Sequence, residues 1–211
     1  MNRQALAVFF LVFSFGFINL AGANAEIVEG KDYTVLTKPQ PTEGDGKIEV
    51  LEFFWYGCPH CYSLHPHLKN WLANIPGDVS FQYVPAILRP NWVPAAKIFY
   101  AIEALGLTGS LHDQVYDAIH RDKIDLNNES VLFDWIEKQG IDRKKFENTL
   151  QSFAVQNQVS RSTQMSRQYQ LNGVPALVIN GKYLTSGRMG STPQDTIKTL
   201  DALLEKIRKE K

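Results

Sequence analysis

Two cysteines that directly follow an apolar run constrain the fold more than any other feature of the chain. Residues 48–55 are Ile-Glu-Val-Leu-Glu-Phe-Phe-Trp, which predicts a strand covered on both faces. Cys58-Pro59-His60-Cys61 comes next, and from the second cysteine onward apolar residues recur at helical spacing. Proline is tolerated in the first turn of a helix. The sequence therefore places both cysteines at the N-terminus of a helix that follows a buried strand.

The rest of the chain divides into an α-helical stretch and a second group of strands. Residues 79–84 predict a strand that completes a right-handed βαβ unit. Residues 92–171 show only helical patterns, and strand patterns return on both sides of Asn180-Gly181, a strong hairpin signal. A last amphipathic helix opens at Thr192-Pro193. We therefore expect an α/β fold interrupted by an all-helical insertion.

Five helices are expected in the insertion. The second begins at Ser110, and the fourth is capped by Asp142 and carries Phe146, Leu150 and Phe153 on its apolar face. The fifth is long and polar and runs toward Asn172-Gly173, which is expected to end it.

The first 25 residues are typical of a secretory signal peptide. Arg3 gives a weakly positive start, an apolar stretch follows, and Ala23-Asn24-Ala25 fits a small-x-small cleavage site. The alternative is an uncleaved membrane anchor, because the apolar stretch approaches the roughly 17–25 residues that span a bilayer. Gly16 and Asn19 within the stretch, and its Ala-x-Ala ending, favour cleavage. We expect cleavage after Ala25 and export of the remaining chain.

The two cysteines are better explained as a reactive dithiol than as a structural staple or a metal site. A crosslink between residues so close removes little chain entropy from the unfolded state. Cys58, Cys61, His65 and His67 could in principle bind zinc, but ligands packed so closely on one helix would hardly close a tetrahedron. We therefore expect no metal, and we expect both histidines to be solvated.

The position of each cysteine on the helix gives it a different chemistry. The first sulfur faces free backbone N–H groups and the positive end of the helix dipole, so the thiolate of Cys58 is stabilised. Cys61 lies one turn inward, which suits a resolving thiol. His60 can add a positive charge or a hydrogen bond to the outer sulfur. A stabilised thiolate stabilises the reduced pair, so the disulfide readily accepts electrons.

Five motifs spread over nearly the whole exported chain share the form of one family. They are Gly30-Lys31-Asp32-Tyr33-Thr34, Val50-Leu51-Glu52-Phe53-Phe54, Cys58-Pro59-His60-Cys61-Tyr62, Gly173-Val174-Pro175-Ala176 and Asn180-Gly181-Lys182-Tyr183. Together they resemble the DsbA family of periplasmic thiol oxidases in the thioredoxin superfamily. The resemblance implies a thioredoxin-like fold with a helical insertion, a periplasmic location and no cofactor. It also implies reoxidation by a quinone-linked membrane partner similar to DsbB.

The resemblance assigns roles to individual residues. It makes Cys58 the attacking cysteine and Cys61 its buried partner, with Pro59 and His60 as the dipeptide between them that tunes the thiolate. It implies a cis bond before Pro175, which would face the disulfide, although only about 5–6% of X–Pro bonds are cis by default. It further implies that the backbone of Val174 pairs with bound substrate.

Glu52 matches the buried acid that the family places beneath the cysteines. A carboxylate in a doubly covered strand is costly and usually has a role, so we interpret it as a proton relay, with a hydrogen-bonded structural acid as the alternative. The family often pairs this acid with a lysine on the next strand. Residues 79–84 contain no lysine, and Gln82 or Tyr83 stands near its expected place. A second departure is Pro66, which should kink the helix.

The predicted organisation has four parts. Residues 1–25 form the signal peptide, 26–91 the first part of a thioredoxin-like domain, 92–159 the helical insertion and 160–211 the second part of the domain. The fold class is therefore α/β, with an all-helical domain inserted between a βαβ half and a ββα half.

The predicted function is oxidation of cysteine pairs in newly exported, incompletely folded proteins. One alternative is a reductase or isomerase of the same fold, although the segment before residue 48 is too short for the extra dimerisation domain of dedicated isomerases. The other is a metal-binding protein without turnover. We expect a monomer that does not bind nucleic acid, because 22 Lys and Arg balance 22 Asp and Glu and leave no basic excess.

Overall fold

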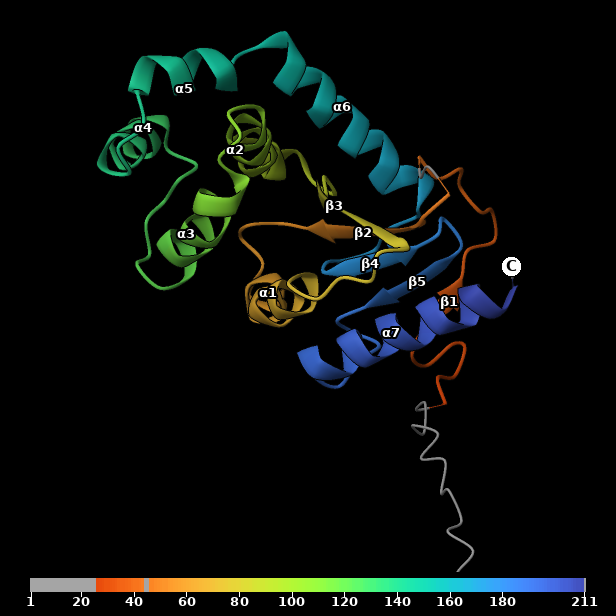
Figure 1. Ribbon diagram of the computed structural model, residues 1–211. Coiled ribbons are helices and arrows are strands. Elements are labelled where there is room, and N and C mark those ends of the chain that lie inside the picture. Colours follow the sequence, from red (N-terminus) through yellow and green to blue (C-terminus); the bar gives the residue numbers. More distant parts are fainter. Residues whose placement is uncertain (1–25, 44–45, 211) are drawn as a thin grey trace, which may run out of the picture.

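The chain forms one mixed sheet with helices on both faces. The structure is a computed structural model that describes residues 26–43 and 46–210, so the expected signal peptide lies outside the described residues. The elements, labelled in Figure 1, are β1 Thr34–Val35, β2 Ile48–Phe54, α1 Pro59–Leu72, β3 Val79–Pro85, η1 Pro90–Trp92, α2 Val93–Ala104, α3 Thr108–His120, α4 Glu129–Lys138, α5 Arg143–Leu150, α6 Phe153–Gln168, β4 Ala176–Ile179, β5 Tyr183–Ser186 and α7 Pro193–Glu210. No helix among the described residues is long and apolar enough to span a bilayer.

The sheet has the strand order β1-β5-β4-β2-β3. β2 and β3 run parallel and are joined through α1, which confirms the predicted βαβ unit. β4 and β5 form the predicted antiparallel hairpin, and Asn180 and Gly181 at its turn both have positive φ. Strand β1 was not predicted, because two residues are too few for a visible pattern. It pairs with β5 and forms one edge of the sheet.

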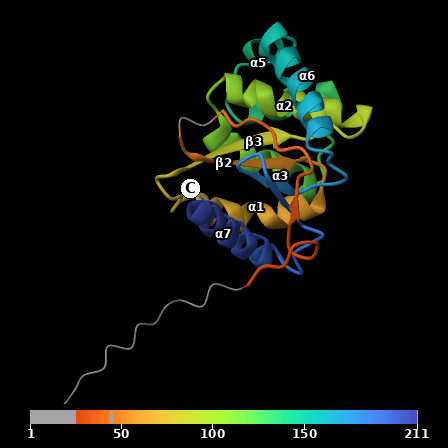
Figure 2. The same ribbon diagram turned by 90° about the vertical axis from the view of Figure 1, so that its right-hand side faces the viewer.

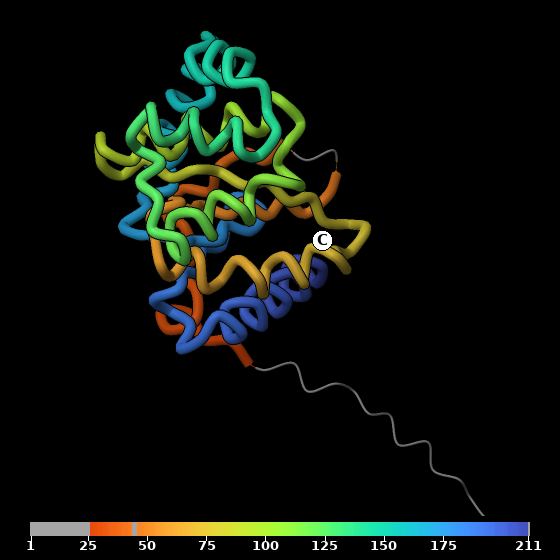
Figure 3. The backbone as a smooth tube through the Cα atoms, turned by 90° about the vertical axis from the view of Figure 1, so that its left-hand side faces the viewer, coloured from red at the N-terminus to blue at the C-terminus, as the bar shows by residue number. Residues whose placement is uncertain are grey.

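The helices divide between the two faces of the sheet. Helices α1 and α7 cover one face and contact each other, as Figure 3 shows for the adjacent gold and blue segments. Helices α2, α5 and α6 lie on the other side in Figures 1 and 2, where α2 and α6 both contact β3. Helix α3 instead lies beside α1 and contacts it. The insertion therefore covers a face of the sheet as well as building its own core.

Strand β2 lies at the centre of this arrangement, and all seven of its residues are buried. Val50 packs in an apolar cluster with α1 and α7, whereas Leu51 and Phe53 pack against Tyr169 just beyond α6. Side chains on a strand alternate between faces, so one short strand contributes to both cores. The predicted strand covered on both faces is confirmed.

The insertion contains the five expected helices with two corrections. Helix α3 begins at Thr108, before Ser110, whose hydroxyl instead donates to the carbonyl of Leu107. Phe153 does not lie on the apolar face of the fourth helix: it starts α6 and is 77% exposed. The cause is Ser152, whose side chain accepts from the N–H of Val155 and so caps a new helix.

The ends and the continuity of three helices test further predictions. Asp142 caps α5 by accepting from the N–H of Lys145, as expected. Helix α1 continues through Pro66 as one helix. Helix α6 is continuous over Phe153–Gln168, so the domain boundary drawn after residue 159 falls within it.

Candidate active site

The two cysteines lie at the start of α1, as the sequence predicts. Cys58 is the N-cap residue with extended backbone angles, and Cys61 is in the first turn. Cys58 is 8% exposed and Cys61 is completely buried, and both are free thiols. Pro59 and His60 between them are exposed. One sulfur is therefore close to the surface and the other is shielded behind it.

The two thiols have opposite acidities. The pKa of Cys58 is lowered to about 6, chiefly by a hydrogen bond from the Cys61 side chain and also by the backbone N–H groups of Cys61 and His60 and the charge of His60. Burial opposes this shift but does not outweigh it. The pKa of Cys61 is raised well above its usual value by burial, then by the nearby Cys58. Near neutral pH the reduced pair is thus an outer thiolate and an inner thiol.

A loop more than a hundred residues away completes the cysteine site. The Val174–Pro175 bond is cis, as expected. The thiol of Cys58 donates to the carbonyl of Val174 across 3.5 Å, which brings this loop against the outer sulfur. The N–H of Gly187 donates to the carbonyl of Pro175, and a side-chain carbon at Gly187 would lie 3.2 Å from the proline ring. The backbone at residue 187 therefore packs closely against the proline.

Glu52 lies beneath the cysteines without a charged partner. It is 1% exposed, and neither carboxylate oxygen has a hydrogen-bond partner among the described residues. Its register partner on β3 is Tyr83, one of the two residues expected in place of the family's lysine. Burial raises the pKa of Glu52 to about 8, so the carboxyl holds its proton at neutral pH.

His65 corrects one prediction, because it is buried rather than solvated. It is 7% exposed, and its Nε2 lies 2.7 Å from Asp113 Oδ1. Its ring lies 4.8 Å from that of His112, whose Nδ1 is 2.7 Å from the Tyr56 hydroxyl. Burial lowers the pKa of His112 to about 3, which keeps that ring neutral. Among the described residues, no three His, Cys, Asp or Glu side chains gather as metal ligands.

Sequence reasoning missed the residues that α3 brings to the site. His112 and Tyr116 lie one turn apart on this helix and pack against His65 of α1. Their spacing is the only signal in the sequence, and it is equally typical of an ordinary core face. The packing of the insertion against α1 brings Tyr116 near Glu52 and both thiols.

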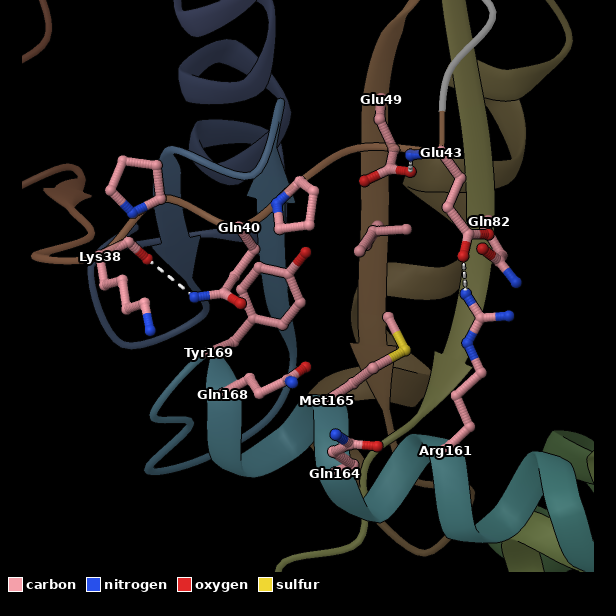
Figure 4. Close-up of a pocket in the computed structure, with 13 residues that line it drawn as sticks. Lys38, Gln40, Glu43, Glu49, Gln82, Arg161, Gln164, Met165, Gln168 and Tyr169 are labelled. Atoms are coloured by element: carbon pink, nitrogen blue, oxygen red, sulfur yellow. Dashed lines mark hydrogen bonds and ion pairs between the residues drawn. The ribbon is translucent and has the colours of Figure 1, made fainter.

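A cavity of about 380 Å³ lies on the α6 side of the sheet (Figure 4). Glu49 of β2 and Arg161 of α6 line it, and the carboxylate of Glu49 accepts from the N–H of Glu43. Arg161 forms an ion pair with Glu43 at the rim. No cysteine lines this cavity, so the thiol chemistry is confined to the other face.

Comparison with known proteins agrees with this site. Residues 49–200 match the DSBA-like thioredoxin domain family. The thiol:disulfide interchange protein DsbA of Burkholderia cepacia is 37% identical over 183 residues, which cover 86% of each chain. The protein of the same name from Pseudomonas aeruginosa is 36% identical over 189 residues, or 90% of each chain.

Solved structures give the same result. The crystal structure of Pseudomonas aeruginosa DsbA has a TM-score of 0.82 and 37% identity, covering 86% of this chain and 94% of that one. The oxidoreductase DsbA from Xylella fastidiosa has a TM-score of 0.79 and 29% identity, covering 86% and 98%.

Proposed function

Because this chain belongs to the DSBA-like thioredoxin domain family and is a thiol:disulfide oxidoreductase, we propose that it oxidises cysteine pairs of other proteins through Cys58 and Cys61. The observation that carries the direction of transfer is the unequal acidity of the two thiols. An outer thiolate with a pKa of about 6 stabilises the reduced pair, so the disulfide form accepts electrons. A pair with two ordinary thiols would lack this driving force.

The reaction consists of two exchanges. A substrate thiolate attacks the Cys58 sulfur of the disulfide, a mixed disulfide forms, and Cys61 leaves as a thiolate that takes up a proton. A second substrate thiolate then attacks the substrate sulfur of the mixed disulfide, and Cys58 leaves as a thiolate. Two substrate thiols lose two electrons and become a disulfide, and the Cys58–Cys61 pair gains those electrons.

The neighbouring residues support these exchanges. The buried carboxyl of Glu52 holds a proton at neutral pH and lies among the groups that raise the pKa of Cys61, so we assign it as the donor to the leaving Cys61 thiolate. Val174 offers its backbone beside the outer sulfur for pairing with an extended substrate. Pro175 keeps the approach to that sulfur free of a backbone N–H.

Compartment and partners are part of the proposal. We infer export to the periplasm with cleavage after Ala25, action as a monomer on incompletely folded proteins with free cysteines, and reoxidation by a DsbB-like membrane quinone reductase. No cofactor is required, because the dithiol carries both electrons. The proposed layout remains 26–91 and 160–211 for the thioredoxin-like domain and 92–159 for the insertion.

Recovery of an oxidised substrate tests the direction of transfer. The oxidised protein is mixed with a reduced, unfolded enzyme whose activity depends on disulfides, and that activity is followed with time. We expect it to appear together with stoichiometric thiols on Cys58 and Cys61. Faster reduction of a disulfide substrate than oxidation of a dithiol would instead assign a reductase. Absence of exchange, together with stoichiometric zinc binding, would assign a metal-binding protein.

Trapping of intermediates tests the order of attack. The variant Cys61→Ala has no internal disulfide, but its Cys58 thiolate can attack a disulfide of a substrate protein and displace one substrate thiolate. Without the inner thiol this mixed disulfide is not broken from within the enzyme, so we expect covalent complexes to accumulate, whereas Cys58→Ala should form none. Non-reducing gel electrophoresis after alkylation measures both. Equal trapping by the two variants would overturn the assignment of Cys58 as the attacking cysteine.

A further inference from the structure

In the oxidised form, the charged side chains among the described residues that line the groove beside Cys58 are all positive. This cavity of about 610 Å³ is bordered by residues 58–60, by the cis-proline loop and by the segment that follows β3. Arg89 and Arg188 line this cavity. None of the described residues that line it is Asp or Glu. A cleft with one sign of charge concentrates ligands of the opposite sign.

Both arginines lack an internal partner. Four of the five other arginines that the structure describes, Arg121, Arg143, Arg161 and Arg208, each form an ion pair with a carboxylate, and Arg167 forms none. Arg89 and Arg188 form none with any residue in the part of the chain that the structure describes, and both are exposed. The two guanidinium groups at the groove are thus available to a carboxylate from outside.

The structure also places Arg188 where bound substrate would pass. A side-chain carbon built on Gly173 would lie 3.6 Å from Cζ, Nε and Nη2 of Arg188, so the guanidinium rests against this glycine. Gly173 directly precedes Val174, whose carbonyl accepts from the outer thiol. A segment whose cysteine reaches Cys58 therefore brings its neighbouring residues close to Arg188.

Arg89 lines the same groove together with a pair of stacked aromatic rings. Trp55 and Trp92 both line the groove, and their rings stack with centroids 4.5 Å apart and planes 2° from parallel. Arg89 is the N-cap residue of η1, which ends at Trp92. The groove thus combines an apolar platform with two cations.

We propose that Arg89 and Arg188 select substrate segments that carry Asp or Glu beside the reacting cysteine. The inference rests on the proposed function and names its substrate class. A carboxylate next to a thiol disfavours the thiolate, so such cysteines react slowly on their own. Two unpaired arginines at the point of attack offset that repulsion and hold the segment in the groove.

Matched peptides test the proposal. Three reduced dithiol peptides differ only in the residues beside the first cysteine, which are Asp-Glu, Asn-Gln or Lys-Lys. Their second-order rates of oxidation by the oxidised protein are measured by stopped-flow fluorescence at low and high salt. Each rate is divided by the rate of the same peptide with a small neutral disulfide, which removes the intrinsic reactivity of the thiol.

The acidic peptide should exceed the neutral one by about three- to tenfold at low salt, and the lysine peptide should be slowest. High salt should reduce the differences among the normalised rates of the three peptides. The double variant Arg89→Ala/Arg188→Ala should reduce the ratio of acidic to lysine peptide to near one, and Arg89→Lys/Arg188→Lys should restore part of it. Arg143→Ala, which removes an arginine of α5 outside the groove, should retain the full ratio.

Equal normalised rates for the three peptides would overturn the recognition proposal while leaving the oxidase function intact. So would a ratio that the Arg89/Arg188 variants leave unchanged. If no peptide is oxidised, the proposed function itself fails.

Discussion

Glu49 and Glu52 lie three residues apart on the same strand, and their surroundings are opposite. Glu49 lines the cavity on the α6 side, where it accepts from the N–H of Glu43 and lies near Arg161 (Figure 4). Glu52 is sealed beneath the cysteines on the other face, with Tyr83 in register beside it. Burial raises the pKa of both, to about 8 at Glu52.

The difference shows how alternation along a strand separates two kinds of acid. The Glu49 carboxyl keeps a donor and access to a cavity, so ionisation costs it less. The Glu52 carboxyl has neither, so it stays protonated and serves as an internal proton store near Cys61. The sealed position makes Glu52 useful for thiol chemistry and also makes it costly for stability at neutral pH.

The largest expected effect is on the free energy of unfolding when each acid is replaced by its amide. An unfolded glutamate ionises near pH 4.3, but folded Glu52 holds its proton up to about 8, so the native state binds the extra proton and loses stability as pH rises between these values. Glu52→Gln cannot ionise and should be more stable than the parent by about 3 kcal/mol at pH 7. Denaturant unfolding of the oxidised form across pH measures this.

Glu49→Gln is the matched control for that experiment. Its amide oxygen can still accept from the N–H of Glu43, and its effect on the pH profile should be small. The assignment of Glu52 as the protonated acid is wrong if Glu52→Gln keeps the pH dependence of the parent, or if the two variants change it equally.

The reduced form should become more stable than the oxidised form by an amount that increases as pH rises. Folded Cys58 has a pKa of about 6 and an unfolded cysteine about 8.5, so its stabilisation is complete above 8.5 and is lost as pH falls through 6. Only the reduced form has this contribution. The reduced form should therefore gain about 3 kcal/mol over the oxidised form between pH 5 and pH 8.5.

Parallel unfolding curves of both redox forms measure this gap. Because the Glu52 effect has the opposite sign over the same range, the stability of the reduced form should change little between pH 6 and pH 8, while that of the oxidised form falls. A gap that is constant with pH would contradict the acidity assigned to Cys58.

Placing a cation opposite Glu52 should lower the pKa of Glu52 and so make it more similar to that of Glu49. In Tyr83→Lys an ammonium group beside the carboxyl lowers the pKa of Glu52, by roughly 1–3 units for a close opposite charge. The loss of stability of the oxidised form between pH 4 and pH 8 should shrink by about 2 kcal/mol. Tyr83→Phe keeps the ring without a charge and should retain the parent profile, and equal profiles for both variants would contradict the prediction.

The smallest expected effect concerns the residue beside the outer thiol. His60 is the last of the groups that lower the pKa of Cys58, after the Cys61 side chain and the backbone N–H groups. His60→Gln should raise that pKa by less than about one unit, measured by thiolate ultraviolet absorbance against pH. His67→Gln, on the same helix, should leave the titration unchanged. If His67→Gln shifts the pKa of Cys58 as much as His60→Gln does, His60 has no specific effect on that thiol.

The positions of β2 and of the cysteines on α1 were predictable because local patterns determine them. An apolar run of strand length, a proline in the first turn and an Asn-Gly between strand patterns each act over a few residues. The same patterns misplaced Phe153, since a cap at Ser152 competes with the apolar periodicity. They also left His65 on the solvent side, because nothing local shows that α3 packs over it.

Local sequence patterns predict the strand, the dithiol at the helix N-terminus and an acid six residues before Cys58. The pKa values of these groups depend on the folded chain, because burial and long-range partners set them. Glu52 becomes a proton store when Tyr83 and the insertion seal it, and the outer thiol gains its neighbour when residue 174 folds back across the chain. Contacts between distant segments leave no periodic pattern in a single sequence, so they are known only once the chain has folded.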